Sequence, residues 1–496
     1  MTKADLRGRY AAMSLEETLP SRRQLYYGGG WHDGEQGEAA LASPSDGRSL
    51  GRVAVAGLGN VDAAVRAAHA GFSVWKNVPP FERGRTLREA ARILRENALE
   101  LAMIDAADCG NPVSAMVGDV ELAASGLEYF SGLVQETKGD TIPMGPGRIN
   151  LTLREPLGVC LRIIPYNHPL MFAAMRAAAP LAAGNALIVK APDQAPLSCL
   201  KLAELWHGLL PDGVFNVMTG GPEIGAAMVG HPLVSKVGLI GSVGTGRKVM
   251  EAASRRLTPV GLELGGKNAL MAWPDADVDK VAQAAIAGMN FTWAGQSCGS
   301  TSRVFLHERI HDEVVQRMSR LIEGMAPGLS LDWDTRMGAL ISRAHLDAVA
   351  GFVSDALRDG AEVVAGGGIP DDAALVHGNF YLPTILANVH SAMRVAREEV
   401  FGPVMSVLRW SDEEELFSAV NGVDYGLSAS IWCNDLTTAM RASQRVEAGY
   451  VWINDVSRHF LGAPFGGFKQ SGFGKEESLE ELLEHTRLKN VNINLA

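Results

Sequence analysis

The chain has 496 residues, enough for two to four domains with large hydrophobic cores, so a peptide or a single small module is excluded. Hydrophobic residues make up 47% and charged residues 20%, which excludes a disordered or fibrous protein. The formal net charge is −11, from 45 basic and 56 acidic residues, and this balance does not favour a nucleic-acid partner.

The sequence carries no pattern of export or membrane insertion. Residues 1–25 hold no apolar core of the secretory type, and Arg176 and Pro180 interrupt the most apolar stretch, 171–189. The five cysteines are scattered and form no C-x-x-C pair, which is typical of a reducing compartment and gives no zinc-ligand spacing. We therefore expect a soluble, cytoplasmic protein with no membrane partner and no bound metal.

Helical patterns open the chain, and a βαβ rhythm follows. Residues 61–74 and 81–106 have apolar residues at helical spacing and predict surface helices. Short β-like runs then alternate with helical ones. The strands are predicted at 159–164, 186–189, 214–217 and 236–240, and the helices at 170–182, 197–210, 223–229 and 245–256. This order predicts a doubly wound parallel sheet with ligands outside the carboxyl ends of its strands.

A second α/β series begins near residue 259. It predicts strands at 268–272, 303–306 and 450–453 and helices at 278–290 and 310–324. The fold class is therefore α/β, with two doubly wound, Rossmann-like parallel-sheet domains around a cleft. Residues 487–495 alternate apolar and polar residues, and such an edge strand pairs either with another subunit or with a distant segment of the same chain.

Cys298 is the candidate nucleophile. It lies in the small-residue turn Gly295-Gln-Ser-Cys-Gly-Ser300, between a predicted helix and a predicted strand. Free backbone N–H groups in such a turn can hold the oxyanion that forms when a thiol attacks a carbonyl. The alternative is that Cys298 is simply a small buried hydrophobic residue.

Two further residues have matching chemistry. Glu263 ends an apolar strand directly before a Gly-Gly turn, where partial burial raises a carboxyl pKa and suits a general base; a surface glutamate is the alternative. Asn167 lies in a proline-flanked turn between a strand and a helix. Its amide can donate to an oxyanion, although asparagine is also an ordinary turn residue.

In combination these segments resemble the NAD(P)-dependent aldehyde dehydrogenases over nearly the whole chain. The matching motifs are Pro165-Tyr-Asn-His-Pro169, Val189-Lys-Ala-Pro-Asp193, Gly241-Ser242, Leu262-Glu-Leu-Gly-Gly-Lys267, Gly295-Gln-Ser-Cys298, Glu399-Val-Phe-Gly-Pro403 and Pro464-Phe-Gly-Gly-Phe-Lys-Gln-Ser-Gly472. The resemblance implies that Cys298 attacks the aldehyde, that Asn167 and the Cys298 N–H hold the oxyanion, and that Glu263 activates the water that hydrolyses the thioester.

The resemblance also implies NAD as the cofactor, with NADP as the alternative. A carboxylate at Asp193 accepts from two ribose hydroxyls and repels a 2′-phosphate, although many relatives carry the longer glutamate there. The turn at Gly241 does not have G-x-G-x-x-G spacing. The cofactor-binding residues implied are Ile164, Pro165, Tyr166, Lys190, Asp193, Gly241, Ser242, Leu264, Glu399 and Phe401.

The sequence departs from the family at Arg176, where many relatives have a lysine that relays protons; a guanidinium stays charged. Glu476 is either a member of such a relay or a solvated surface residue. The residues expected to face the aldehyde are His168, Met171, Met175, Thr292, Ser297, Ser457, His459 and Phe465. They favour a medium-sized aromatic or polar-substituted aldehyde over a long alkyl one. Alternatively, His168 and His459 hydrogen-bond loop backbone.

The domain boundaries follow from the same resemblance. Residues 1–130 and 152–261 form the dinucleotide-binding domain, 262–460 the catalytic domain, and 131–151 with 475–496 a small β arm for assembly into a homodimer or homotetramer. Two other functions are open: a CoA-acylating semialdehyde dehydrogenase, in which Glu263 has no use, and a catalytically silent scaffold.

Overall fold

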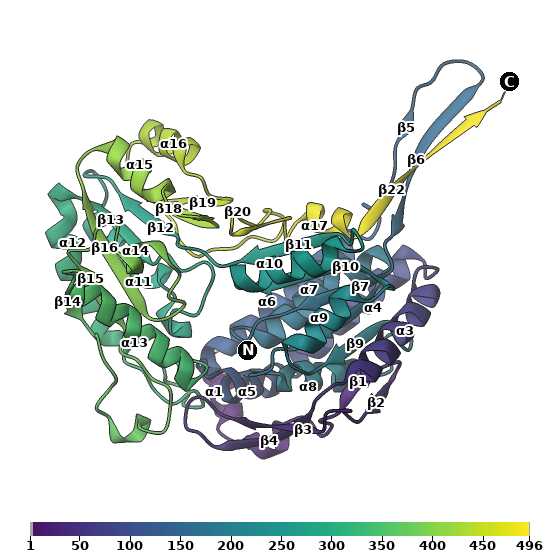
Figure 1. Cartoon of the computed structure of the whole chain (residues 1–496), viewed down its shortest axis with the longest axis horizontal. Helices are drawn as coiled ribbons and strands as arrows, with labels where there is room; N and C mark the ends of the chain where they lie inside the picture. The colour runs from purple at the N-terminus through teal and green to yellow at the C-terminus, as the bar shows by residue number, and fades with distance from the viewer. Residues whose placement is uncertain (1–2, 496) are drawn as a thin grey trace.

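The computed structural model describes residues 3–495. Two lobes lie side by side, and a thin arm projects from the first lobe, with the C-terminus at its tip (Figure 1). Each lobe is built on its own sheet, of eight strands in the first and seven in the second. The predicted fold class, two parallel-sheet domains with a small β arm, is confirmed.

The first sheet has the strand order β2-β1-β9-β8-β7-β10-β11-β21. Its five central strands are parallel: β7 (Val159–Ile163), β8 (Ala186–Lys190), β9 (Phe215–Met218), β10 (Val234–Gly241) and β11 (Val260–Leu264). Three short strands complete it: β1 (Leu25–Tyr27), β2 (Gly30–His32) and β21 (Gly472–Phe473). The chain passes from β7 to β8 on one side and returns to β10 on the other. The carboxyl ends of β7 and β10 therefore form the switch point where such sheets bind ligands.

Helices cover both faces of this sheet because successive strand residues point to opposite sides. Val159 and Leu161 pack into one hydrophobic cluster, and Cys160 between them packs into another. The helices are α3 (Leu58–Trp75), α4 (Pro80–Glu96), α5 (Ala98–Cys109), α6 (Val113–Gly132), α7 (Pro169–Ala183), α8 (Leu197–Trp206), α9 (Pro222–Gly230) and α10 (Val243–Ser254).

The prediction of a single helix over 81–106 is wrong, because the segment forms two helices, α4 and α5, with a break at Asn97. The Asn97 side chain donates to the Ile93 carbonyl at 2.8 Å, so it competes with the backbone for that acceptor. The helix ends there, and the residues that follow form α5, most of which is buried.

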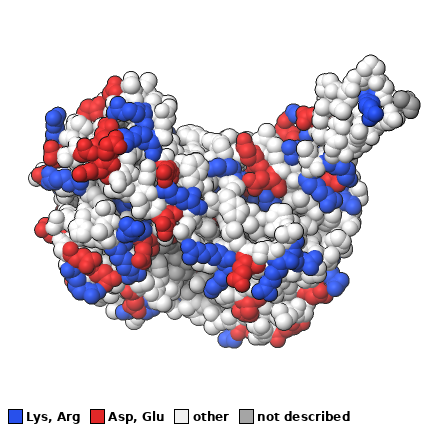
Figure 2. Space-filling view, turned by 45° about the horizontal axis from the view of Figure 1, so that its top comes forward, with Lys and Arg blue, Asp and Glu red and all other residues white. Residues whose placement is uncertain are grey.

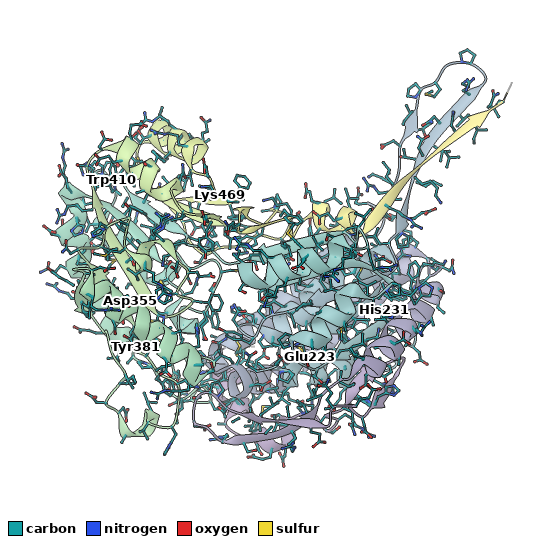
Figure 3. The ribbon with its side chains drawn as sticks, in the orientation of Figure 1. Glu223, His231, Asp355, Tyr381, Trp410 and Lys469 are labelled. Atoms are coloured by element: carbon teal, nitrogen blue, oxygen red, sulfur yellow. The ribbon has the colours of Figure 1, made fainter. Side chains whose placement is uncertain are left out.

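The second sheet has the order β14-β15-β16-β13-β12-β18-β19, with six parallel strands. The strands are β12 (Ala269–Ala272), β13 (Arg303–His307), β14 (Glu362–Ala365), β15 (Thr384–Ala387), β16 (Val404–Trp410), β18 (Ser428–Trp432) and β19 (Tyr450–Ile453). Its helices are α11 (Val278–Gly288), α12 (Glu308–Leu321), α13 (Arg343–Arg358), α14 (Arg394–Arg397), α15 (Glu413–Asn421) and α16 (Leu436–Arg445). Trp410, labelled in Figure 3, ends β16. It packs edge-on against Trp273 and His307.

The arm is a three-stranded antiparallel sheet of β5 (Thr141–Ile142), β6 (Arg148–Pro156) and β22 (Thr486–Asn494). The predicted C-terminal edge strand thus has a partner in its own chain. The arm strand β6 runs on to Pro156, past the boundary expected at residue 151. Within residues 3–495, the outer edge of β22 pairs with no strand.

The arm is mostly uncharged on the face that Figure 2 shows at the upper right. Its exposed large apolar side chains are Ile142, Met144, Ile149, Leu153, Leu488, Ile493 and Leu495. An open strand edge beside exposed apolar residues is a surface that proteins normally cover.

The remaining elements are short. They are α1 (Lys3–Tyr10), α2 (Leu15–Thr18), β3 (Glu38–Ala42), β4 (Ser49–Ala54), η1 (Phe291–Trp293), η2 (Ile322–Met325), η3 (Ala373–Leu375), β17 (Tyr425–Gly426), β20 (Phe468–Lys469) and α17 (Leu479–Glu484). None of the helices formed by the described residues combines the length and apolarity needed to span a membrane.

Candidate active site

Cys298 lies in the turn between η1 and β13. It is half-buried, whereas the other four cysteines of the chain are buried. The Asn268 amide fixes the turn by donating to the Cys298 carbonyl at 2.6 Å and to the Ser300 carbonyl at 3.1 Å. A side chain on Gly266 would place its Cβ 2.8 Å from the same carbonyl, so glycine is needed at this close approach. These contacts hold the thiol at an accessible position.

Glu263 lies at the carboxyl end of β11 and is only 4% exposed, so the surface alternative is wrong. Burial, with a contribution from the nearby Glu476 carboxylate, raises the pKa of Glu263 to about 8. The carboxyl group is close enough to the Cys298 thiol for a side-chain hydrogen bond, and its Oε1 has no hydrogen-bond partner among the described residues. A buried carboxyl group beside a thiol, with one oxygen free, can accept a proton from that thiol or from a water.

The nearby Glu263 carboxylate also changes the pKa of the Cys298 thiol. Burial and the Glu263 carboxylate raise the pKa of the Cys298 thiol well above its ordinary value. In this arrangement the thiol is therefore protonated near neutral pH, and its conversion to the nucleophilic thiolate requires a base.

Asn167 lies between β7 and α7, where His168 precedes a proline in the first turn of the helix. Its Nδ2 donates to the Gln296 carbonyl at 2.9 Å, two residues before the thiol. Its backbone carbonyl accepts from the Asn111 amide at 2.7 Å. One of the two N–H bonds of the amide is engaged, which leaves the other to donate elsewhere. The turn of the first domain is thus fastened to the Cys298 turn of the second.

Two cavities meet at these three residues. One has a volume of about 370 Å³ and the other of about 230 Å³. Asn167, Glu263 and Cys298 line both. The structure therefore brings the three sequence-predicted catalytic residues together, on the wall between two chambers.

The larger chamber lies at the switch point of the first sheet. Of the predicted cofactor residues, six line it: Pro165, Tyr166, Gly241, Ser242, Glu399 and Phe401. Gly241 and Ser242 precede α10, whose N-terminus favours negative charge. Burial raises the pKa of Glu399 to about 7, and its Oε1 accepts from the Gly266 N–H at 2.9 Å. A cradle with a helix N-terminus and a carboxyl hydrogen-bond acceptor fits a dinucleotide.

The other four predicted cofactor residues are not among the residues that line this chamber. Lys190 and Asp193 form an ion pair with each other after β8. Ile164 and Leu264 are buried in the hydrophobic clusters on the two faces of the sheet. Ile164 and Leu264 reach a ligand only through their backbone, since their side chains point into packing.

The smaller chamber contains six of the eight residues expected to face the aldehyde: His168, Met171, Ser297, Ser457, His459 and Phe465. Met175 and Thr292 are not part of its lining. Residues that the sequence analysis missed complete the wall: Asp119, Leu122, Phe172, Asn290, Trp293, Gly299, Trp452 and Glu477, together with Arg176. Gly299 lies in the turn of Cys298, but most of the others come from elements far apart in the chain, and no local motif marks them.

A network of buried charges lies behind this chamber. Arg176 contacts Glu476 at 2.9 Å and Glu477 at 3.2 Å. Arg162 contacts Glu476 at 3.2 Å and Glu481 at 2.7 Å. The Glu476 side chain is only 12% exposed, so the solvated-surface alternative for it is wrong. Both arginines form ion pairs with carboxylates, as buried charges require.

Comparison with known proteins identifies the family. The family model described as the aldehyde dehydrogenase family matches residues 31–491. Aldehyde dehydrogenase tropH of Talaromyces stipitatus is 50% identical over 490 residues, covering 97% of this chain and 95% of that protein. Betaine aldehyde dehydrogenase of Mesorhizobium japonicum is 39% identical over 471 residues, covering 94% of this chain and 96% of that protein.

Solved structures agree. PnpE from Pseudomonas sp. WBC-3 is similar with a TM-score of 0.93 and 36% identity, covering 96% of this chain and 98% of that one. PnpE in complex with nicotinamide adenine dinucleotide superposes equally well, with a TM-score of 0.93. The resemblance seen in the sequence is confirmed: the chain belongs to the aldehyde dehydrogenase family, whose members are oxidoreductases that act on aldehydes with a nicotinamide dinucleotide.

Proposed function

We propose that this protein oxidises an aldehyde to the carboxylic acid with NAD, through covalent intermediates on Cys298. The observation that carries the proposal is the wall shared by the two chambers. A thiol, a carboxyl group and a free amide N–H occupy it together. This is the set that acyl-transfer chemistry on a thiol requires.

Cys298 begins the reaction. Its thiol loses its proton to the solvent, and the sulfur of the resulting thiolate bonds to the aldehyde carbon. The carbonyl oxygen then carries negative charge, which the Asn167 amide and the Cys298 backbone N–H stabilise. The chemistry supplied by the bound dinucleotide is acceptance of the hydride that leaves this carbon. Cys298 then holds the acyl group as a thioester.

Glu263 completes the reaction by taking a proton from the water that attacks the thioester, which releases the acid and frees Cys298. Behind Glu263 lies a cavity of about 20 Å³, lined also by Glu476, Lys475 and Glu484. That volume holds about one water. Because Glu484 is partly exposed, this cavity offers a proton path from Glu263 towards the solvent.

We also propose that the protein prefers NAD to NADP, because the Asp193 carboxylate repels a 2′-phosphate. Five free cysteines fit a reducing compartment such as the cytoplasm. The open edge of β22 and the exposed apolar residues of the arm support assembly into a homodimer or homotetramer. Light scattering tests this by comparing the mass of the full chain in solution with that of a chain ending at residue 485.

The main test is an aldehyde panel followed by NADH absorbance, with NAD and with NADP. Cys298→Ala is expected to lower NADH formation at least about 10⁴-fold while NAD binding by calorimetry persists. Retained turnover in Cys298→Ala would contradict the proposal. Cys433→Ala is the matched control, because Cys433 is buried in the second domain away from both chambers.

The second candidate function, CoA acylation, is separated by product analysis. With water as the acceptor, free acid forms at the same rate with and without CoA. Stoichiometric acyl-CoA with no free acid would establish the alternative. The buried Glu263 beside the thiol favours water, because transfer to CoA has no use for a water-activating base.

A further inference from the structure

The substrate chamber contains two imidazole rings that are each held by a carboxylate. His168 and Asp119 come from the first domain, and His459 and Glu477 come from the loops that follow β19 and β21. The alternative reading of these histidines, as hydrogen-bond donors to loop backbone, is wrong. Both rings use one nitrogen for a carboxylate and have the other left for a ligand.

The first pair is short and enclosed. His168 Nδ1 donates to Asp119 Oδ2 at 2.6 Å, and both side chains are about one-tenth exposed. Trp293 and Phe172 meet the imidazole edge to face, at centroid distances of 4.9 Å and 5.8 Å. Aromatic neighbours on two sides fix the plane of the ring. Among the described residues, no side chain or backbone group hydrogen-bonds its Nε2.

The second pair is tied to the buried charges. His459 Nδ1 donates to Glu477 Oε2 at 3.1 Å, and Oε1 of the same carboxylate accepts from Arg176 at 3.2 Å. Phe465 packs against the imidazole at a centroid distance of 4.4 Å. Glu477 is thus satisfied by two partners and presents no free charge to the chamber. The His459 Nε2 has no hydrogen-bond partner in the part of the chain that the structure describes.

A third polar atom lines the same chamber. Ser457 has a left-handed backbone with φ of 55°, a conformation that a serine adopts at a cost. Its Oγ is buried and lacks a hydrogen-bond partner within residues 3–495. An unsatisfied buried hydroxyl is unfavourable unless a ligand completes it.

The chamber wall decides among the classes of aldehyde. Its volume of about 230 Å³ is small, and tryptophan, phenylalanine and histidine rings make up much of the lining, which suits one flat ring. A long alkyl chain leaves the polar atoms unsatisfied. A quaternary ammonium group also leaves these polar atoms without a hydrogen bond, since it can neither donate nor accept one. A ring hydroxyl both donates and accepts, and therefore matches Nε2 in either protonation state of the imidazole.

We infer that the substrate is a single-ring aromatic aldehyde carrying a hydroxyl group, which His168, His459 and Ser457 recognise. The inference rests on the proposed function, because it places the aldehyde carbon at Cys298. His168 and His459 are then specificity-determining residues, and Asp119 and Glu477 are positioning residues that set the orientation of each ring.

The test compares kcat/KM for 3- and 4-hydroxybenzaldehyde with kcat/KM for benzaldehyde, hexanal and betaine aldehyde. The better hydroxylated ring is expected to exceed benzaldehyde at least about tenfold, because a site built for a hydroxyl rejects the analogue that lacks it. His168→Phe, His459→Phe or both are expected to bring this ratio towards one. His377→Phe, on the exposed surface outside both chambers, is the matched control and is expected to keep the wild-type ratio.

A binding measurement separates recognition from chemistry. In Cys298→Ala, calorimetry is expected to show tighter binding of the hydroxylated ring than of benzaldehyde, and Asp119→Asn is expected to reduce that difference. Equal values for the two rings in both kinetics and binding, or a preference for hexanal or betaine aldehyde, would overturn the inference. Absence of any aldehyde oxidation would overturn the proposed function instead, and the binding comparison would still decide the recognition of the hydroxyl.

Discussion

The two chambers that meet at Cys298 are built in different ways. The cofactor side combines turns at the ends of β7, β10 and β11, which contribute Gly241 and Gly265, with α13 and the loop 399–401 of the second domain. The substrate side consists of side chains from α6, α7, η1 and the loops after β19 and β21, with carboxylates behind them. The first side depends on glycines at strand ends and the N-terminus of α10, and the second on imidazole rings held by carboxylates.

The difference predicts where each side is vulnerable. A turn that depends on glycine is disrupted when a side chain is added to it. A wall of oriented rings fails when the charges behind it are removed. The residues on the shared wall affect both sides, and changes there are expected to have the largest effects.

Glu263→Gln tests the shared wall. The amide cannot take a proton from water, so we expect an initial burst of NADH followed by a stall at the thioester, with steady-state turnover lowered about 10²- to 10⁴-fold. Rapid-quench kinetics and mass spectrometry of the trapped acyl enzyme measure this. Because the variant also removes a negative charge beside the thiol, the midpoint pH of Cys298 alkylation is expected to fall. Unchanged steady-state turnover would show that another base deprotonates the hydrolytic water.

Arg176→Met tests the charges behind the substrate wall. It leaves Glu476 and Glu477 buried without their shared cation, and breaking a buried pair in this way costs about 3–5 kcal/mol. Urea unfolding monitored by circular dichroism gives the free energy. Arg255→Met is the control, since the Arg255 side chain is 77% exposed and is expected to change little. Equal free energies of unfolding for the two variants would contradict a structural role for this charge network.

Gly265→Ala tests the cofactor cradle alone. A Cβ at this position would lie 1.9 Å from Glu399 Oε2, so the carboxylate must leave its place in the cavity. NAD binding is expected to weaken at least about tenfold, while binding of an aromatic aldehyde to the substrate side stays the same. Gly118→Ala, where the added carbon meets only open space, is the matched control. Loss of both affinities together would mean that the chambers are not independent.

The pH dependence of thioester hydrolysis gives the smallest effect. Because the pKa of Glu263 is raised to about 8, the group is mostly protonated at pH 6 and acts as a base only after losing that proton. We expect the hydrolysis rate to rise about tenfold per pH unit below pH 8 and to level off above it. Stopped-flow pH jumps on the preformed acyl enzyme measure the hydrolysis rate at each pH. A flat profile between pH 6 and pH 9 would rule out Glu263 as the base.

Much of this site was predictable because its parts are local. Asn167 follows the carboxyl end of β7 and Glu263 lies at the carboxyl end of β11, and the carboxyl ends of parallel strands gather at one edge of a sheet. Cys298 lies in a local small-residue turn before β13. The alternation of β-like and helical runs likewise predicts both sheets. The break at Asn97 was missed because it depends on one side-chain hydrogen bond within a continuous helical pattern.

The sequence by itself determined the two parallel-sheet domains, since strand periodicity acts over a few residues. It also indicated the proposed nucleophile, the proposed base and the turns expected to face the cofactor, through motifs that resemble those of the family. Only the tertiary structure decided which residues line the substrate chamber. The pair of His168 with Asp119 spans 49 positions, and that of Arg176 with Glu477 spans 301. Such contacts depend on how whole helices and loops pack, and no local pattern of residues encodes them.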